Sequence, residues 1–365
     1  MEITRPTLIV NKNTCLRNIE IMLEKAKRHH LRFRPHFKTH QSIVIGRWFR
    51  DFCIKEITVS SVQMAKYFAD DGWKDITIAI PFNVLETDEL NTISPDTKIN
   101  LTVDNLKTVE IIGKKIKRET DIYIEINTGY NRTGISSTSI NRISEIQNRI
   151  VSFPHLHYKG FLTHSGHTYQ SKSKHEIQNI HFDTLKKIND LKSYFSKSFP
   201  EIEISIGDTP ACSASENFTG VTEIRPGNFV FYDLMQHDLG ACNIDDIAIR
   251  MFCPVISKQP QRNEVVIYGG AVHFSKDWIR NTDGKELFGR VILKKGEVSE
   301  LLDTTNYLCR LSQEHGVIRM NPKVFRQIEI GDVLEIVPVH ACLTADAMGC
   351  YFTKDNAEIE MMPRV

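Results

Sequence analysis

Residues 98–126 read KINLTVDNLKTVEIIGKKIKRETDIYIEI, and this stretch decides the fold expected for the chain. Its middle, Asn105–Glu119, has the helical period, with four apolar residues on one face: Leu106, Val109, Ile112 and Ile116. The β-rich runs Lys98–Val103 and Asp121–Ile126 flank this helix. Because the runs are apolar more than strictly alternating, they are typical of a parallel sheet covered on its outside.

The same rhythm extends in both directions from this unit. Short β-rich segments recur at Phe33–His36, Ile57–Ser60, Asp75–Ile80, Lys98–Val103, Asp121–Ile126, His157–Thr163, Glu201–Ile206 and Val221–Ile224. Most are separated by helical patterns: Ser42–Asp51, Val62–Asp71, Asn83–Leu90, Asn105–Glu119, Ser139–Arg149 and Lys174–Phe195. Strands that alternate with helices in this way predict a (β/α)8 TIM-type barrel ending near Leu239. A doubly wound sheet is the alternative.

From about Asp245 the pattern changes to apolar strands separated by Gly, Pro and Asn turns, with little helical periodicity. The strand candidates are Ala248–Ile256, Glu264–Tyr268, Phe288–Leu293 and Asp332–Val337. This texture predicts a second, mainly antiparallel β domain.

Composition narrows the class of protein. The 365 residues hold 46 Lys plus Arg against 45 Asp plus Glu, so no long-range field favours nucleic acid or an acidic membrane. Small molecules are therefore the expected partners. No apolar run has the length of a membrane span, the start does not have the order of a signal peptide, and eight cysteines are spread singly. We expect a cytoplasmic protein with reduced thiols.

In a barrel, function gathers in the loops that follow the strands. The first such loop reads Arg34-Pro35-His36-Phe37-Lys38-Thr39-His40 and holds Lys38 between two histidines. Neighbouring positive charge and partial burial disfavour an ammonium group, and an amine with a lowered pKa can attack a carbonyl or aldehyde. The alternative is a basic surface turn.

Four later strand ends add polar groups. The loop Asn127–Gly134 carries Arg132, and Thr163–Tyr169 carries His164 and Tyr169. The last two loops, Gly207–Ala211 and Arg225–Phe229, contain glycine at the positions where barrels often bind phosphate. The chain has neither a GxGxxG motif nor a Walker loop, which argues against nicotinamide and nucleotide cofactors.

A lysine at the barrel mouth opposite a phosphate site favours pyridoxal 5'-phosphate, with Lys38 holding the aldehyde as a Schiff base. The rival ligand is a sugar phosphate, with Lys38 as an aldolase-type amine.

A second signal lies in the β domain, at His340-Ala341-Cys342. If this segment is extended, His340 and Cys342 project from one face, and an imidazole with a thiolate suits zinc. Two ligands would leave positions open for water or substrate, as in catalytic sites. The alternative is a buried thiol beside a hydrogen-bonded histidine. Asp346 is a possible further ligand.

These motifs together resemble the D-threonine aldolase and D-serine dehydratase family of pyridoxal-phosphate enzymes, which share the barrel of alanine racemase. The stretches that carry the resemblance are Thr7-Leu8, Arg34–His40, Arg132–Gly134, His164–Tyr169, Gly207–Pro210, Glu223–Phe229 and His340–Cys342. They follow the family's order over essentially the whole chain. The resemblance implies a cofactor-binding barrel over residues 14–239 and a β domain, with the metal site, over 1–13 and 240–365.

The resemblance also implies roles for single residues. Lys38 would bind the cofactor's aldehyde, Arg132 would lie by its phenolic oxygen, and Arg225 matches the residue that faces the pyridine nitrogen in alanine racemase. The remaining cofactor-binding positions are His164, Tyr169, Thr209, Gly227, Asn228 and Tyr232, and Lys38, His164 and Tyr169 are the implied catalytic residues. His340 and Cys342 would bind the metal, with zinc expected, and the protein would form a homodimer.

In this family a His-x-Cys pair accompanies zinc-dependent dehydratases, whereas His-x-Asp accompanies aldolases. The resemblance at Cys342 therefore favours a lyase that converts D-serine, or a related D-β-hydroxy amino acid, into a 2-keto acid and ammonia. A retro-aldol cleavage to glycine and an aldehyde is the alternative. A metal-free racemase and a non-catalytic pyridoxal-phosphate-binding protein are further alternatives.

Overall fold

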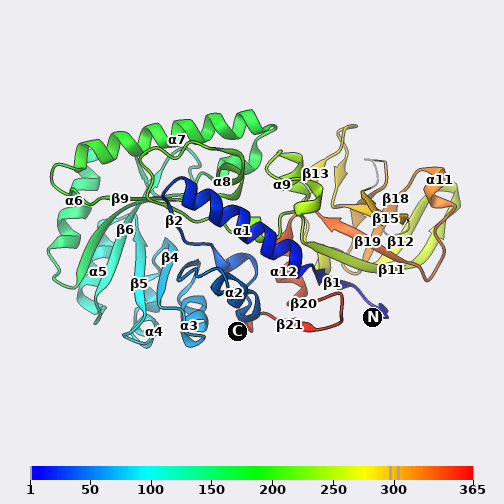
Figure 1. Cartoon of the computed structure of the whole chain (residues 1–365), viewed down its shortest axis with the longest axis horizontal. Helices are drawn as coiled ribbons and strands as arrows, with labels where there is room; N and C mark the ends of the chain where they lie inside the picture. Colours follow the sequence, from blue (N-terminus) through cyan, green and yellow to red (C-terminus); the bar gives the residue numbers. More distant parts are fainter. Residues whose placement is uncertain (1, 296–297, 302–304, 365) are drawn as a thin grey trace. The chain divides into compact units, whose positions relative to one another are not determined.

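The chain forms two compact units in the structure, a computed structural model that describes residues 2–295, 298–301 and 305–364 (Figure 1). One unit is Glu20–Phe229, and the other joins Met1–Ile19 to Val230–Val365. The boundary near the N-terminus falls inside α1 (Lys12–Arg28). The two units are described in turn.

The unit of residues 20–229 contains a parallel sheet that curls into a nearly closed barrel. Its strands are β2 (Arg32–Phe33), β3 (Glu56–Val59), β4 (Asp75–Pro81), β5 (Lys98–Val103), β6 (Thr120–Asn127), β8 (Leu156–Thr163), β9 (Glu203–Ile206) and β10 (Glu223–Ile224). They pair in the order β2-β10-β9-β8-β6-β5-β4-β3, and β7 (Ile135–Ser136) pairs with β6. An isolated parallel bridge between His36 and Thr58 links the two ends of this order. The predicted TIM-type barrel is confirmed.

Helices connect the strands and cover the barrel. After α1 they are α2 (Ile43–Arg50), α3 (Val62–Asp70), α4 (Thr87–Leu90), α5 (Leu106–Lys115), α6 (Ile140–Val151), α7 (Lys174–Phe195) and α8 (Thr209–Ala214). Figure 1 shows α5, α6 and α7 outside the strands. Helix α5 is capped by Asn105, whose side chain accepts a hydrogen bond from the Thr108 N–H at 2.9 Å. It ends at Lys115, four residues earlier than the pattern predicts, because Ile116 is extended and buried.

A buried ionic network fixes the start of the first functional loop. The side chain of Arg34 is 2% exposed; its Nε donates to Glu223 at 2.7 Å and its Nη1 to Asp75 at 2.6 Å. Burial alone would lower the pKa of Arg34, but these carboxylates raise it well above its ordinary value, so the guanidinium stays charged. Strands β2, β4 and β10 are thereby tied together inside the barrel.

The other unit is built on one large sheet, which pairs in the order β12-β18-β17-β15-β19-β11-β1-β20-β21, with β16 beside β15. The strands are β1 (Thr7–Val10), β11 (Ile249–Gln259), β12 (Glu264–Tyr268), β15 (Gly289–Lys295), β16 (Val298–Leu301), β17 (Tyr307–Leu311), β18 (His315–Arg319), β19 (Val333–Pro338), β20 (Cys350–Phe352) and β21 (Glu358–Glu360). All pairs are antiparallel except β1 with β20. The predicted mainly antiparallel sheet is confirmed.

This unit also contains short helices: α9 (Leu234–Asp238), α10 (Ala271–Phe274), α11 (Pro322–Phe325) and α12 (Ala341–Met348). A separate hairpin pairs β13 (Ile279–Arg280) with β14 (Glu286–Leu287). Across the residues that the structure describes, no helix combines the length and the apolar character needed to cross a membrane.

Candidate active site and metal centre

Lys38 lies in a single helical turn, η1 (Phe37–Thr39), that follows β2. Its side chain is exposed, whereas its neighbours Phe37 and Thr39 are buried. His36 caps the turn: its Nδ1 accepts a hydrogen bond from the Lys38 N–H at 3.3 Å. His40, fully buried, packs its ring 4.5 Å from that of Phe37. The two histidines therefore hold the backbone and the core on either side of the exposed amine.

The loops after β8, β9 and β10 meet beside this turn. The Thr209 N–H donates to the Tyr169 hydroxyl at 3.2 Å, and the Gly227 N–H donates to Thr209 Oγ1 at 3.3 Å. The Lys38 turn joins them because the His36 N–H donates to the Pro226 carbonyl at 2.9 Å. A Cβ atom added at Gly227 would lie 2.9 Å from the His36 carbonyl oxygen, closer than such atoms approach. Glycine at position 227 thus allows the loop after β10 to contact the Lys38 turn.

Arg225 is held inside the barrel by its neighbours on the adjacent strands. It is 4% exposed; its Nε donates to Ser205 Oγ at 2.7 Å and its Nη2 to the Thr163 carbonyl at 2.9 Å. Gly207 lies against it, since an added Cβ there would be 3.0 Å from the Arg225 Cβ. The guanidinium therefore has a fixed place below the loops, as a residue that contacts a cofactor ring needs.

His164 directly follows β8, and its Nδ1 donates to the Gly207 carbonyl. The ring of Tyr130 lies edge-on to it, with centroids 5.8 Å apart, and the Arg132 guanidinium carbon lies 5.3 Å from the Tyr130 ring centroid. With Nδ1 as the donor, Nε2 of the neutral imidazole carries the lone pair.

The charged side chains of this region lower the pKa values of two of its histidines. Burial, and then the charges of Lys38 and Arg225, lower the pKa of His36 well below its ordinary value. Burial lowers the pKa of His164 to about 3, partly opposed by its bond to Gly207 and reinforced by Lys38, Arg132 and Arg225. Both imidazoles are therefore neutral at pH 7, among three cationic side chains.

The donor set of this region fits pyridoxal phosphate. It offers a primary amine for an aldehyde, guanidinium groups for ring oxygen and nitrogen atoms, and hydroxyl and backbone N–H donors for a phosphate. The sequence-predicted residues Lys38, Arg132, His164, Tyr169, Thr209, Arg225, Gly227 and Asn228 all lie in the unit of residues 20–229. Tyr232 belongs to the other unit and has a left-handed backbone, with φ of 47°.

The predicted metal-binding pair lies after β19, and the structure does not meet the condition of an extended segment on which the spacing argument depended. His340 is extended and caps the N-terminus of α12, whereas Cys342 lies in the first turn of that helix. The alternation argument was therefore wrong in its premise. The residues from 341 to 348 read ACLTADAM, which are mostly good helix formers, and Gly349 ends the helix in the left-handed conformation. The imidazole nevertheless contacts the thiol, since a hydrogen bond to Cys342 contributes to the pKa of His340.

Two carboxylates contact the residues at the start of α12. His340 Nδ1 lies 2.6 Å from Asp277 Oδ2, and the Ala341 N–H donates to Asp233 Oδ2 at 2.9 Å. Burial lowers the pKa of His340, but the bonds to Asp277 and Cys342 outweigh it and raise that pKa to about 11. A metal ion must therefore displace a proton to bind here.

The number of protein ligands is small. Within residues 2–295, 298–301 and 305–364, no three His, Cys, Asp or Glu side chains are grouped so that they could hold a metal ion. Asp346 forms an ion pair with Arg364 at 3.0 Å. The imidazole and thiolate of His340 and Cys342 suit zinc among the common metals, and a two-ligand site leaves positions for substrate and water.

Sequence reasoning missed three residues of these sites. Ser205 orients Arg225, Asp277 contacts His340, and Asp208 caps α8 by accepting from the Ala211 N–H at 2.7 Å. The Asp208 cap has a sequence signal, because Asp followed by Thr-Pro begins helices. Ser205 and Asp277 have none, since their partners lie 20 and 63 residues away.

Comparisons with known proteins agree with this architecture. Residues 10–234 match the family model for the N-terminal domain of alanine racemase, and residues 248–353 match a serine dehydratase domain. The D-serine dehydratase of Dictyostelium discoideum is 30% identical over 95% of this chain and 91% of its own. This chain belongs to the D-serine dehydratase and D-threonine aldolase family. The pyridoxal-phosphate dependence of that family agrees with the donor set around Lys38.

Other members of the D-serine dehydratase family extend the comparison. The D-threo-3-hydroxyaspartate dehydratase of Delftia sp. is 26% identical over 95% of this chain and 93% of its own. Its solved structure has a TM-score of 0.90 with 23% identity, covering 100% of this chain and 98% of that one. Two variants of that enzyme have also been solved: a cysteine-to-alanine variant in the metal-free form, and a histidine-to-alanine variant. The D-threonine aldolase of Arthrobacter sp. is 21% identical over 92% of this chain and 85% of its own.

Proposed function

We propose that the protein is a pyridoxal-phosphate- and metal-dependent lyase that removes ammonia from a D-β-hydroxy amino acid, with D-serine as its substrate. The observation that carries this proposal is the contact of His340 with Cys342 at the start of α12. The replaced histidine and cysteine of the Delftia enzyme have the same order and the same spacing of two residues. A relative named D-serine dehydratase, 30% identical, supports the choice of substrate.

We assign the cofactor site to the unit of residues 20–229 and the metal site to the other unit. Lys38 would hold the aldehyde. Thr209, Gly227 and Asn228 would hold the phosphate, Arg132 the phenolic oxygen, and Arg225 the ring nitrogen. When bound, pyridoxal phosphate supplies a ring that withdraws electrons from the substrate's α-carbon. His340 and Cys342 would hold zinc, a Lewis acid for the β-hydroxyl.

We assign the remaining steps of the reaction to side chains of the protein. The Lys38 amine removes the α-proton, because it is the exposed base on the turn beside the cofactor loops. His164 acts as a neutral hydrogen-bonding group, since its pKa of about 3 keeps it uncharged and its Nδ1 is held by Gly207. The Tyr169 hydroxyl accepts a hydrogen bond from the Thr209 N–H, which holds Tyr169 at the start of α8. The reaction balances: D-serine first loses water, the same amount of water is taken up again when the resulting imine is hydrolysed, and the net products are pyruvate and ammonia.

The test is a product assay on the purified protein loaded with pyridoxal phosphate. D-serine, D-threonine and L-serine are each incubated with zinc, and again after chelation, and keto acid, ammonia and glycine are measured. We expect pyruvate and ammonia from D-serine, no product from L-serine, and loss of activity on chelation that added zinc restores. Lys38→Ala should abolish turnover. Glycine without keto acid would overturn the proposed dehydration.

Retro-aldol cleavage is the second candidate, because relatives of this chain include proteins named 3-hydroxy-D-aspartate aldolase and D-threonine aldolase. It predicts glycine and acetaldehyde from D-threonine. The racemase alternative predicts instead that L- and D-alanine interconvert and that chelation leaves the rate unchanged. We further propose that the enzyme is a homodimer, which sedimentation of the holoenzyme tests directly.

A further inference from the structure

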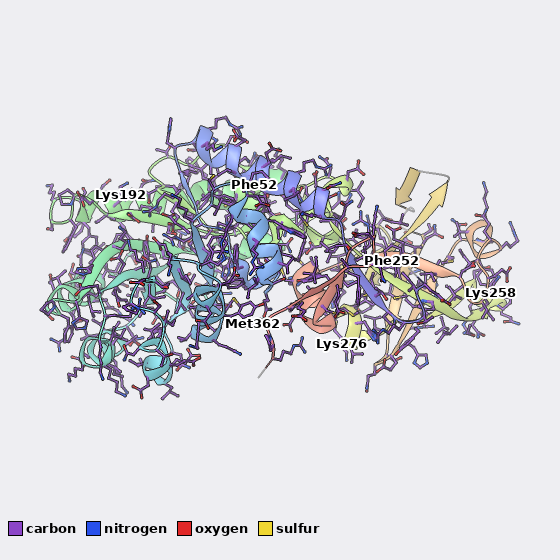
Figure 2. The ribbon with its side chains drawn as sticks, turned by 60° about the horizontal axis from the view of Figure 1, so that its bottom comes forward. Phe52, Lys192, Phe252, Lys258, Lys276 and Met362 are labelled. Carbon is purple, nitrogen blue, oxygen red and sulfur yellow. The ribbon has the colours of Figure 1, made fainter. Side chains whose placement is uncertain are left out.

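Asp277 is a side chain at the metal centre to which neither the motif nor the proposed chemistry assigns a role. It lies between α10 and β13, directly after Lys276, which is labelled in Figure 2. Its Oδ2 is 2.6 Å from Nδ1 of His340, a residue 63 positions later in the chain. Both residues belong to the same unit.

The contact with Asp277 determines which ring nitrogen of His340 can bind a metal ion. An ionised carboxylate only accepts hydrogen bonds, so the ring nitrogen that faces Asp277 must carry the proton. The lone pair of the neutral imidazole is then on Nε2. Metal ligation by histidine uses such a lone pair, and the opposite N–H usually donates to a carboxylate or a carbonyl.

The segment that carries Asp277 is itself attached to the helix of the metal pair. Thr344, one turn after His340 in α12, donates through Oγ1 to the Phe274 carbonyl at 3.0 Å. The Asp277 N–H donates to Ser275 Oγ at 3.3 Å, and Ser275 has a left-handed backbone with φ of 70°. A non-glycine residue adopts this conformation only where its surroundings require it. The carboxylate is thus placed by α10 and α12 together.

We propose that Asp277 is the positioning residue of the metal centre: it holds the Nδ1–H of His340, so that Nε2 binds the metal, and thereby sets the metal affinity. Asp277 does not complete a set of three ligands, since no such group exists among the described residues. This inference rests on the proposed metal site at His340 and Cys342 and adds a residue to it.

The experiment measures metal binding by the full-length protein, independently of turnover. Zn²⁺ is titrated in competition with a chromophoric chelator, and Co²⁺ is used as a spectroscopic probe for the thiolate-to-metal band of Cys342. Asp277→Ala removes the acceptor, whereas Asp277→Asn keeps an acceptor oxygen without the charge. Glu314→Gln is the matched control, because Glu314 pairs with another histidine of the same unit, His273, at 3.9 Å.

We expect Asp277→Ala to weaken Zn²⁺ binding about 10- to 100-fold, the range found for outer partners of metal-binding histidines. Asp277→Asn should recover part of the loss with an unchanged Co²⁺–thiolate band, and Glu314→Gln should bind like the wild type. Thermal unfolding of the metal-free variants establishes that they are folded.

Wild-type affinity in Asp277→Ala would overturn the inference, as would an Asp277→Asn variant no better than Asp277→Ala. These results leave the proposed function intact if the wild type binds one Co²⁺ with a thiolate band. A wild type that shows no such band would overturn both the metal site and the role of Asp277, so the two failures are distinguishable.

Discussion

At the scale of single residues, Ser205 carries two interactions that are both buried. Its hydroxyl donates to Glu223 Oε1 at 2.6 Å and accepts from Arg225 Nε at 2.7 Å. Ser205→Ala leaves a buried carboxylate and a buried guanidinium each short of a partner, which costs about 1–3 kcal/mol of unfolding free energy. We expect weaker pyridoxal-phosphate binding as well. Urea unfolding and cofactor titration measure the two effects, and equal values for variant and wild type would refute the role given to Ser205.

A second residue-scale prediction concerns pH. Burial lowers the pKa of His40 from about 6.5 to about 3, so the fold favours the neutral ring. The unfolded chain binds this proton below pH 6.5 and the folded protein only near pH 3, so stability is present above pH 6.5 and is lost as the pH falls. His36 and His164 add to the same trend.

His40→Asn tests this linkage. The asparagine oxygen can accept the Ser42 N–H, as His40 Nδ1 does at 3.1 Å, but it does not titrate. We expect lower stability at pH 8, because the ring contacts with Phe37 and Phe49 are lost, and a shallower decline below pH 6.5. The difference in slope should approach 1.4 kcal/mol per pH unit. Chemical unfolding at pH 8, 6 and 5 gives both slopes; parallel profiles would contradict the prediction.

The residues that sequence reasoning could find are those that lie in loops with a recognisable pattern. Lys38 stands out because two histidines bracket it directly after a strand, and His340 and Cys342 because they are close in sequence. Ser205 and Asp277 act through partners on other elements, and only the folded chain brings them together. A serine inside a strand and an aspartate in a turn are too common to be singled out.

At the scale of elements, the loop after β10 depends on a residue without a side chain. A Cβ at Gly227 would lie 2.9 Å from both the His36 carbonyl oxygen and Thr39 Oγ1, so Gly227→Ala must displace the turn that holds Lys38. We expect at least a tenfold loss of cofactor affinity, a cost of about 1.4 kcal/mol. Gly331→Ala is the comparison for cofactor affinity: its φ of 95° makes alanine costly for the fold, but a Cβ there meets nothing within 4 Å and the residue is not among the predicted cofactor-binding residues. Absorbance titration with pyridoxal phosphate measures both; equal affinities would contradict the prediction.

Helix α8 begins at the loop that we propose binds the cofactor phosphate, and a buried lysine anchors its other end. Lys25 Nζ donates to the carbonyls of Cys212, Ser213 and Ser215 at 3.1, 2.8 and 2.9 Å. Lys25→Met should therefore destabilise the protein by about 3 kcal/mol, because hydrogen bonds from charged groups contribute about 1.5–3 kcal/mol each and are only partly replaced by water. Lys27→Met, an exposed neighbour in α1 paired with Glu24, should change stability by less than about 0.5 kcal/mol. Thermal unfolding of both variants measures these two changes in stability, and equal values would contradict the prediction.

Most elements could be predicted from periodicity, and the errors have a physical origin. The spacing argument for His340 and Cys342 depended on an extended segment, but Cys342 lies in helix α12, and periodicity cannot separate the two states in so short a segment. The early end of α5 reflects the burial of Ile116, which turns the chain away from the helical path. In both places local propensity is compatible with more than one backbone conformation, and tertiary packing determines which one forms.

At the scale of the whole molecule, the first strand of the chain is an interior member of a sheet that is otherwise made by the last third. β1 pairs with β11 on one side and β20 on the other. Leu8→Ala, at a fully buried position of β1, should cost about 2–5 kcal/mol. Backbone amide hydrogen exchange should then become faster in β11 and β20, which lie more than 200 residues away in sequence. The reason is that β1 pairs with these strands; Leu8, for example, lies opposite Met251 of β11.

Ile21→Ala is the control for that experiment, because Ile21 is 55% exposed on α1 and should change stability by no more than about 0.5 kcal/mol. Unchanged exchange in β11 with Leu8→Ala would show that β1 does not stabilise the sheet.

The place of β1 has a consequence for how the protein is made. Its pairing partner β20 ends at Phe352, so the nascent N-terminal strand leaves the ribosome long before its last neighbour has been translated. At about 5–20 residues per second, some twenty seconds or more separate the two events. During that interval the strand has unpaired edges, which are templates for wrong pairing. Synthesis of this enzyme should accordingly depend on a chaperone that covers β1 until the chain is complete.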